Sequence, residues 1–263
     1  MSHLEKPDGD PHAATKDRYL EEYDLSFAER WDRVVGWEAR ARREGTFYRD
    51  LLNAAGARRV LDAATGSGFH AILLAEAGFD VTATDGAPAM VDKARENVAQ
   101  HDLDVRCEVS DWRDLASLDA DAFDAVLCLG NSLSHLFDGD DLVETLETFN
   151  TVLVEGGILI LDQRNHDAIL DGTAPPQGDR YCCTGADIVL DMMDARSLRI
   201  TYTLDEGRSR HSIETCPWRR GEMLEALDAA GFGDIRTFGD FNEHFDPATA
   251  EFLVHVGRSP FRA

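Results

Sequence analysis

Short apolar runs alternate along this chain with segments in which apolar residues recur at helical spacing. Such runs are typical of buried strands, and apolar residues every three or four positions are typical of helices that cover a sheet. The alternation predicts an α/β fold, with a doubly wound, mostly parallel sheet that a closing antiparallel pair completes. The predicted strands are residues 58–61, 79–84, 103–109, 122–129, 158–161, 232–238 and 251–256, and the predicted helices are 17–52, 69–77, 87–100, 141–153 and 219–230.

Two segments depart from this alternation. Residues 1–16 are polar and rich in Asp, Gly and Pro, which predicts a disordered tail. Residues 171–217 contain short alternating runs such as 197–203, which predict antiparallel strands. We therefore expect an N-terminal helical lid at 17–52, a core built from 53–170 and 218–263, and an antiparallel insertion at 171–217 that walls the substrate side. We also expect Gly156 and Gly157 to end the helix before the fifth strand.

The most informative turn follows the first predicted strand, where Asp62 precedes Gly66 and Gly68. Glycines let the backbone bend or approach a ligand closely, and open α/β sheets build small-molecule sites at such turns. Gly66, Gly68 and Ala71 also satisfy a dinucleotide fingerprint. Asp62 would repel a pyrophosphate and suits a cation. The turn therefore favours S-adenosylmethionine, which has two cationic groups and no phosphate, over a dinucleotide, and a purely structural turn stays open.

Acidic residues also follow the second and third predicted strands. Asp85 stands near the offset from the first strand at which a carboxylate accepts hydrogen bonds from ribose hydroxyls, although it also suits a helix cap. Asp111 can accept from an adenine amino group and Trp112 can cover the ring; a turn Asp and a core Trp are the alternatives. Met90 fits a contact with adenine as well as it fits core packing.

The fourth and fifth predicted strands end in residues that suit a small substrate. Gly130 lets the chain turn, so Asn131 sits at the mouth of the sheet, able to donate and accept. Arg164 can bind a carboxylate through two parallel hydrogen bonds, unless one of the many acids pairs with it. His135 is a candidate for cofactor contact, for packing or, less favoured, for catalysis as a base. No residue has the pattern of a strong base, so we expect the substrate to lose its proton to water.

The segment 17–52 is dense in aromatic and arginine residues. One interpretation is an amphipathic cap on the sheet, and the other is a lid that brings side chains over the pocket. Tyr23 and Arg40 are the leading candidates for such lid contacts, followed by Trp37 and Arg43.

Composition narrows the class of partners. The chain has 26 Lys and Arg against 50 Asp and Glu, a net charge of −24, which disfavours nucleic acid and anionic membranes. This balance favours adaptation to a salty cytoplasm, where screening reduces self-repulsion, over an acidic protein from an ordinary cell. The 5 cysteines show no metal-ligand spacing, which predicts reduced thiols and no metal site. No long apolar run and no signal-peptide core are present, which predicts a cytoplasmic protein.

Three stretches, residues 61–68, 128–132 and 162–170, together resemble the glycine N-methyltransferase group of class I S-adenosylmethionine-dependent methyltransferases. The glycine turn is generic to these enzymes, whereas the other two stretches are specific to the group; further similar residues lie at 135–136, 239–241 and 252–256. With the acidic composition, the chain looks most like the glycine/sarcosine N-methyltransferases of halophiles. The resemblance implies a Rossmann-like, seven-stranded sheet with one antiparallel strand, and an insertion after strand five that covers the substrate.

The resemblance also implies an activity: methylation of glycine to sarcosine and of sarcosine to dimethylglycine, early steps toward the osmolyte betaine. S-adenosyl-L-methionine would be the cofactor and S-adenosyl-L-homocysteine its product. The expected catalytic residues are Tyr23, Asn131 and Arg164, which would bind the substrate together with Tyr181 and Tyr202. The expected cofactor-binding residues are Trp31, Trp37, Arg40, Asp62, Ala64, Gly66, Asp85, Met90, Asp111, Trp112, Leu129 and His135.

Other functions remain compatible with the sequence. A methyltransferase that acts on sarcosine and dimethylglycine, or on another small amine, would use the same pocket chemistry. A non-catalytic module that binds S-adenosylmethionine is a second alternative, and a nicotinamide oxidoreductase is a third. We expect small-molecule partners and neither nucleic acid nor membrane, with a monomer slightly favoured over an oligomer.

Overall fold

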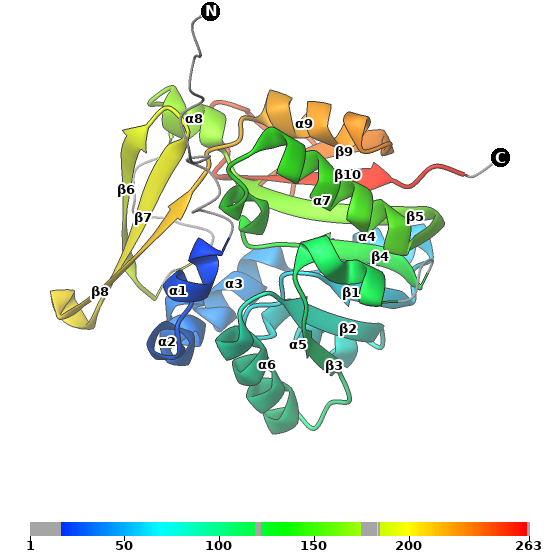
Figure 1. Ribbon diagram of the computed structural model, residues 1–263, viewed down its shortest axis with the longest axis horizontal. Helices are drawn as coiled ribbons and strands as arrows, with labels where there is room; N and C mark the ends of the chain where they lie inside the picture. Colours follow the sequence, from blue (N-terminus) through cyan, green and yellow to red (C-terminus); the bar gives the residue numbers. More distant parts are fainter. Residues whose placement is uncertain (1–16, 119–121, 175–182, 184, 262–263) are drawn as a thin grey trace, which may run out of the picture.

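The computed structural model describes residues 17–118, 122–174, 183 and 185–261 of the 263-residue chain (Figure 1). The predicted tail at 1–16 lies outside these residues, as does the start of the expected insertion at 175–182.

The central sheet has seven strands within the described residues, in the order β3-β2-β1-β4-β5-β10-β9. Strands β1 to β5 run parallel, and β10 is antiparallel to both β5 and β9. The predicted sheet, with one antiparallel strand inserted between two others, is therefore confirmed. The strands are β1 (Arg59–Asp62), β2 (Asp80–Asp85), β3 (Arg106–Val109), β4 (Phe123–Cys128), β5 (Leu153–Arg164), β9 (Gly233–Gly239) and β10 (Phe252–Arg258).

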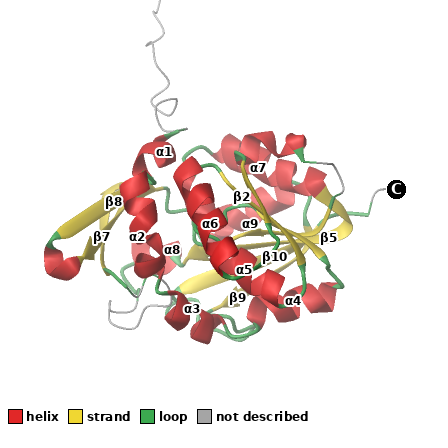
Figure 2. Ribbon diagram, turned by 90° about the horizontal axis from the view of Figure 1, so that it is seen from below, coloured by secondary structure: helices red, strands yellow, loops and turns green. Residues whose placement is uncertain are grey.

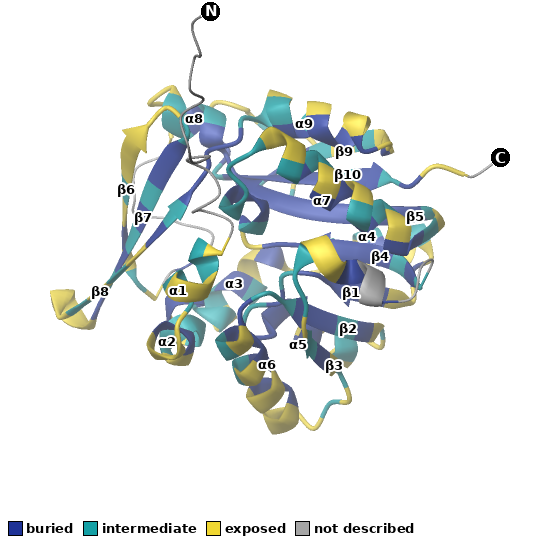
Figure 3. Cartoon of the chain, viewed as in Figure 1, coloured by how far each residue is buried: buried dark blue, intermediate teal, exposed yellow. Residues whose placement is uncertain are grey.

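Helices cover both faces of this sheet, because successive strand residues point to opposite sides. Val60 packs in the hydrophobic cluster that includes side chains from α4, α5 and α6, whereas Leu61 packs with α7 and α9. The inner strands are mostly buried between the two layers, whereas the two edge strands of the sheet are partly exposed (Figure 3). The covering helices are α4 (Phe47–Ala55), α5 (Phe69–Glu76), α6 (Pro88–Gln100), α7 (Gly139–Val152) and α9 (Arg220–Ala229), with short 3-10 segments η1 (Trp112–Ser117) and η2 (Ser132–His135).

A second sheet of three antiparallel strands lies at the end of the core (Figure 1). It follows β5 and the short helix α8 (His166–Leu170), so the predicted antiparallel insertion after strand five is confirmed. Its strands are β6 (Asp187–Asp194), β7 (Ser197–Leu204) and β8 (Ser209–Thr215), with the 3-10 turn η3 (Asp205–Gly207) between the last two.

The N-terminal segment folds as several short helices rather than one continuous helical stretch. Asp24 caps the second helix through a hydrogen bond from the backbone N–H of Phe27, and Gly36 and Gly45 take positive φ angles of 69° and 56° that end helices. Figure 2 shows the first two helices between the three-stranded sheet and α6. The helices are α1 (Arg18–Glu22), α2 (Leu25–Val35) and α3 (Trp37–Glu44), followed by α4.

The prediction for the region before and within strand five was wrong in its boundaries. The helix ends at Val152, and β5 starts at Leu153 and continues through both glycines to Arg164. Gly157 belongs in the strand because a side chain there would meet the carbonyl oxygen of Asp124 at 3.1 Å, close to a register shift between β4 and β5. The third strand is also shorter than predicted, since it begins at Arg106.

Candidate functional site

A cavity of about 870 Å³ opens at the carboxyl ends of β1, β2, β3 and β4. The N-terminal helices contribute its outer wall, and the glycine turn contributes its floor. The expected cofactor residues that line it are Trp31, Arg40, Ala64, Gly66, Asp85, Met90, Asp111, Trp112, Leu129 and His135.

The glycine turn approaches the lid closely. Gly66 and Gly68 have φ angles of 54° and 92°, which residues other than glycine rarely adopt. A side chain on Gly66 would also come within 3.2 Å of the indole nitrogen of Trp31. Both the bend and the contact with Trp31 therefore require glycine at position 66.

Asp85 is fixed by this turn. Its carboxylate accepts a hydrogen bond from the backbone N–H of Gly66 and another from that of Ala87, each 2.9 Å long. Burial nevertheless raises the pKa of Asp85 to about 6, because these bonds compensate only part of the lost hydration. Asp85 thus joins the glycine turn to the residue that precedes α6 and also forms part of the cavity wall; it is not the N-cap of α6, which is Ala87.

Asp111 and Trp112 lie on the opposite wall. Asp111 accepts a 2.9 Å hydrogen bond from the hydroxyl of Tyr19, and it pairs with Arg113 on its other side. Trp112 donates from its indole nitrogen to the carbonyl oxygen of Ala63 at 2.6 Å, which fixes the ring beside β1. The sequence analysis missed Tyr19, which lines the cavity and lies one helical turn before Tyr23.

Asp62 does not line the cavity. It is fully buried beneath the turn, and neither carboxylate oxygen has a hydrogen-bond partner among the described residues. Burial raises the pKa of this carboxyl, partly offset by the nearby His70. Asp62 can act on a ligand in the cavity only as a charge beneath the floor.

A second cavity, of about 420 Å³, adjoins the first. Arg164 and Asn131 line it, and Tyr202 of β7 closes it from the three-stranded sheet. The guanidinium of Arg164 lies 5.2 Å from the ring centroid of Phe252, and the residue is only 5% exposed. The end of β5 and the three-stranded sheet therefore meet around the buried guanidinium of Arg164.

Asn131 is built into this second cavity by a tight turn. Gly130 and Asn131 have φ angles of 87° and 64°, and the buried carboxylate of Asp162 accepts hydrogen bonds from both of their backbone N–H groups, at 2.6 and 2.8 Å. The Asn131 side-chain oxygen accepts from the backbone N–H of Arg164 at 2.9 Å. No described residue uses its side-chain nitrogen, which remains available to a ligand.

The two cavities share a wall. The shared side chains come chiefly from the N-terminal helices and from the segment after β4, so a ligand in one cavity would be adjacent to a ligand in the other. The shared residues are Tyr23, Trp31, Val35, Arg40, Gly130 and His135.

Tyr23, His135 and Glu22 form a line of polar contacts along this wall. The hydroxyl of Tyr23 lies 3.2 Å from Nε2 of His135, and Nδ1 of His135 lies 3.8 Å from Oε2 of Glu22. Burial lowers the pKa of His135 to about 4 and raises that of Glu22 to about 7. The imidazole is therefore neutral at ordinary pH, and Glu22 titrates near neutrality.

Arg40 enters the shared wall from a buried charged cluster. Its Nε atom donates to Glu44 at 2.6 Å, and Glu44 also contacts His70 at 3.0 Å. The guanidinium of Arg40 is 3.7 Å from the carboxylate of Asp162. Glu44 of α3 and His70 of α5 are neighbours of the site that the sequence did not predict, because helical spacing alone gives no sign that the two helices turn these side chains toward Arg40.

Besides Asp62, two more of the expected site residues are not among the residues that line either cavity. Trp37 packs edge-on against Phe69 at a centroid distance of 5.4 Å and lies near His101, so it stiffens the lid without lining a cavity. Tyr181 lies outside the described residues.

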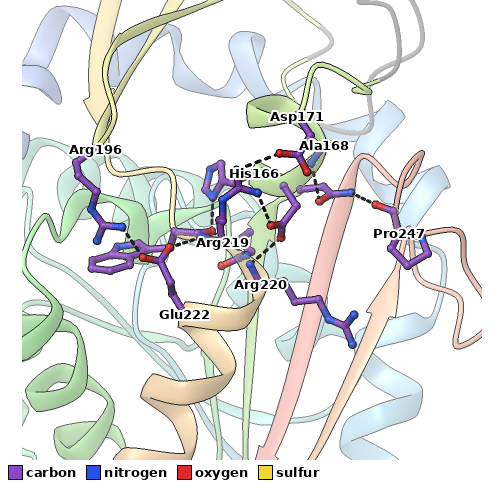
Figure 4. Close-up of polar contacts among 12 residues, drawn as sticks. His166, Ala168, Asp171, Arg196, Arg219, Arg220, Glu222 and Pro247 are labelled. Carbon is purple, nitrogen blue, oxygen red and sulfur yellow. Dashed lines mark hydrogen bonds and ion pairs between the residues drawn. The ribbon is translucent and has the colours of Figure 1, made fainter.

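The segment that follows Arg164 is held by contacts to α9 (Figure 4). Nδ1 of His166 lies 2.9 Å from the carbonyl oxygen of Trp218, and Arg219 pairs with Asp171 at 3.0 Å. These contacts fix the end of β5, and with it the position of Arg164.

Among the described residues, no group of three or more His, Cys, Asp or Glu side chains is arranged to hold a metal ion. Nor does any helix in the described ranges combine the length and hydropathy that a membrane crossing needs.

The charges around the first cavity favour a cationic ligand over a phosphate. Asp62, Asp85 and Asp111 surround the turn, and Arg40 is the one lysine or arginine among the lining residues. A ligand with a sulfonium and an ammonium suits the acids, and its carboxylate suits Arg40. The residues present thus fit S-adenosyl-L-methionine.

Comparison with known proteins agrees with this chemistry. A family model described as a methyltransferase domain matches residues 60–157. The solved structure of an S-adenosylmethionine-dependent methyltransferase from Clostridium acetobutylicum covers 89% of this chain and 98% of its own, with a TM-score of 0.70 and 17% identity. At that identity the likeness shows the fold alone.

Sequence relatives are much more similar. Glycine/sarcosine N-methyltransferase from Aphanothece halophytica is 42% identical over 243 residues, which cover 92% of this chain and 91% of the relative. The protein of the same name from Halorhodospira halochloris is 39% identical, over 94% and 92% of the two chains. Human glycine N-methyltransferase is 35% identical over 78% of this chain and 81% of its own.

Proposed function

Because this chain belongs to the glycine/sarcosine N-methyltransferase family, we propose that it methylates the nitrogen of glycine to give sarcosine, and that of sarcosine to give dimethylglycine. The methyl donor is S-adenosyl-L-methionine, which supplies an electrophilic methyl group on a sulfonium and leaves as S-adenosyl-L-homocysteine. In the cell these reactions would be the first steps toward betaine.

The observation that carries the proposal is the pairing of the two cavities. The first presents acids at strand ends, and the second holds the buried guanidinium of Arg164. A cationic methyl donor and an amino acid with a free carboxylate are the ligands that this charge arrangement recognises.

In the first cavity, each wall would hold a different part of the donor. Asp85 would accept from ribose hydroxyls, Asp111 from the adenine amino group, and Trp112 would cover the ring. Arg40 would bind the carboxylate of the methionine part. The remaining expected contacts are Trp31, Ala64, Gly66, Met90, Leu129 and His135, with Asp62 acting as a buried charge and Trp37 through packing.

In the second cavity, Arg164 would bind the substrate carboxylate through two parallel hydrogen bonds. Asn131 would donate from its unused side-chain nitrogen, and Tyr23 would contact the amine at the boundary between the cavities. Tyr202 would close the pocket, and we assign the same role to Tyr181.

These residues act mainly by orientation. Holding the carboxylate at Arg164 and the amine at Tyr23 fixes the nitrogen lone pair along the shared wall, toward the first cavity. Such positioning can supply about 7–11 kcal/mol of the barrier reduction when the reacting atoms are well aligned. No covalent intermediate with the protein is needed.

Mass spectrometry tests this function directly. The protein, glycine and methyl-labelled S-adenosyl-L-methionine are incubated in concentrated KCl, and sarcosine and dimethylglycine are offered as substrates in parallel. We expect label in sarcosine and dimethylglycine. If a labelled product forms only when dimethylglycine or another small amine is offered, that amine is the substrate. If no amine of a broad panel becomes labelled, the protein is a binding module without turnover.

A further inference from the structure

Glycine at neutral pH carries an ammonium group, which has no lone pair to attack a methyl group. The sequence predicts that water removes this proton before binding. The structure instead shows a line of groups, leading away from the shared wall, that could take the proton within the site.

The line begins at Tyr23, which borders both cavities. Its hydroxyl is 3.2 Å from Nε2 of His135, whose Nδ1 faces Glu22 at 3.8 Å. A carboxylate accepts and cannot donate, so the tautomer with hydrogen on Nδ1 is favoured, and Nε2 then accepts from Tyr23. With its own hydrogen directed at His135, the Tyr23 oxygen offers its lone pairs to an ammonium group in the cavity.

Glu22 is suited to end this line. Its Oε1 atom accepts from the backbone N–H of Glu214 at 2.8 Å, whereas its Oε2 atom is buried and has no hydrogen-bond partner among the described residues. Burial raises the pKa of Glu22 to about 7, although the hydrogen bond from the Glu214 N–H and the charge of Arg18 oppose the rise, and the carboxylates of Glu214 and Glu21 add to it. A carboxylate with this pKa accepts a proton readily near neutral pH.

The surroundings of His135 and Tyr23 favour passage of a proton through these side chains over a lasting charge on either of them. Burial holds the pKa of His135 at about 4 and raises that of Tyr23 well above its usual value. Asp85 and Cys183 face Tyr23 and oppose its ionisation, while Arg164 favours it. Neither ring therefore keeps a charge, and a proton entering the line would come to rest on Glu22.

We propose that Glu22 is the proton acceptor for the substrate ammonium, and that Tyr23 and His135 relay the proton to it. The inference rests on the proposed function. The ammonium N–H bond breaks and leaves its electron pair on nitrogen, while a new O–H bond forms on Tyr23. The original Tyr23 hydrogen moves to Nε2 of His135, and the Nδ1 hydrogen moves to Oε2 of Glu22. The net change is a neutral amine and a neutral carboxylic acid.

The 3.8 Å step is longer than a direct hydrogen bond. Catalytic contacts are often long in free enzymes and shorten when substrate binds, and one bridging water would serve equally. The side chains of His135 and Glu22 are 13% and 11% exposed, so little bulk water competes for the transferred proton.

The test is the pH dependence of kcat/KM for glycine in the wild type and in Glu22→Gln. Glutamine keeps an oxygen for the Glu214 N–H but cannot take the proton. General-base effects are typically 10²–10⁴-fold, so we expect Glu22→Gln to lose about 100-fold near pH 7. The loss should shrink as the pH rises to values where glycine itself is deprotonated in water. The control is Glu29→Gln, an exposed lid position with the same charge change, which should follow the wild type.

His135→Gln is the second variant, because it breaks the same line without altering Glu22, and it should show the same pH-dependent loss. Because His135 is also an expected cofactor contact, both variants are assayed at saturating S-adenosyl-L-methionine. An affinity within about threefold of wild type in Glu22→Gln would show that its N-terminal helices are assembled. A loss that is equal at all pH values, or no loss, in both variants would overturn the relay while leaving the proposed function intact. Failure of the wild type to methylate glycine at any pH would overturn both.

Discussion

The side-chain oxygen of Asn131 accepts a hydrogen bond from the backbone N–H of Arg164 at 2.9 Å. The turn after β4 thereby positions the tip of β5, and Asn131 and Arg164, both expected substrate residues, form one unit. Ser134 donates to the same oxygen at 3.1 Å, so the side chain of Asn131 is fixed before any ligand arrives.

This contact makes Asn131 a structural as well as a binding residue. Asn131→Ala leaves the buried Arg164 N–H without an acceptor, which costs about 1–3 kcal/mol. It also places at φ 64° an alanine, which lacks the polar side chain that lets asparagine tolerate this conformation and costs up to about 1–2 kcal/mol more. Urea unfolding should show a loss of about 2–5 kcal/mol at most. Asn131→Gly relieves the backbone strain, so it should recover about 1–2 kcal/mol of that loss without restoring the KM for glycine. An alanine variant as stable as wild type would contradict the prediction.

Arg164→Ala should raise the KM for glycine about 100-fold or more, because two charge-assisted hydrogen bonds of about 1.5–3 kcal/mol each are lost. Lysine at this position keeps the positive charge but cannot donate two parallel hydrogen bonds. The glycine KM of Arg164→Lys should therefore lie between those of the wild type and Arg164→Ala. Calorimetry should find S-adenosyl-L-methionine affinity close to normal in both. Arg42→Ala, on the exposed face of α3, is the control. A collapse of cofactor affinity with an unchanged glycine KM would reassign Arg164 to the first cavity.

Helix α3 carries two ion pairs of identical spacing and different burial. Arg40 and Glu44 are buried with side chains 7% and 4% exposed, whereas Arg42 and Glu38 are 71% and 94% exposed. Removing one partner of a buried pair costs about 3–5 kcal/mol, so Glu44→Ala should lower the free energy of unfolding by that amount and weaken cofactor binding through Arg40. Glu38→Ala should cost less than about 1 kcal/mol. Equal effects from the two variants would count against a special role for the buried cluster.

The affinity for S-adenosyl-L-methionine should fall in acid because of Asp85. Its carboxylate must be ionised to accept from ribose hydroxyls, and its pKa in the free protein is raised to about 6. Binding favours the ionised form, so affinity is full above that pKa and declines as the pH falls through it. Asp85→Asn should bind more weakly at pH 8 and show a flatter profile between pH 5 and 7 in titration calorimetry. A wild-type affinity that is constant over this range would refute the assignment.

The melting temperature should rise with KCl. The net charge of −24 makes the folded state repel itself, and the screening length shortens from about 30 Å at 0.01 M salt to about 3 Å at 1 M. Most of the rise should come below about 0.5 M, where screening changes fastest. An equal concentration of sucrose, which does not screen charge, should raise the melting temperature less over this range. A curve that is flat in KCl would argue against salt adaptation.

Much of the fold could be predicted because a strand that is buried on both faces needs a continuous apolar run. Residues 123–128 show this most clearly, and β4 was placed almost to the residue. Strand five was predicted too short, because two consecutive glycines such as Gly156 and Gly157 are typical of a loop between a helix and a strand. At Gly157 the lack of a side chain suits the close approach of the Asp124 carbonyl of the neighbouring β4, a contact that local sequence does not indicate.

The site was predicted in part for a related reason. Residues at strand tips, such as Asp85 and Arg164, follow from topology because parallel strands end at one edge of the sheet. Tyr19 and Glu22 were missed because their partners Asp111 and Glu214 are 92 and 192 residues away in sequence. The roles proposed for all these residues, and the division into lid, core and insertion, stay predictions for the experiments above.

The wall common to both cavities also governs kinetics. Tyr23, Trp31 and Arg40 border donor and acceptor alike, so neither ligand can settle without touching side chains that the other uses. Initial-rate plots should therefore intersect, as in a sequential ternary-complex scheme, rather than run parallel. We therefore expect release of the demethylated donor to involve movement of the same helices, and this opening is a candidate for the slowest event of each turnover.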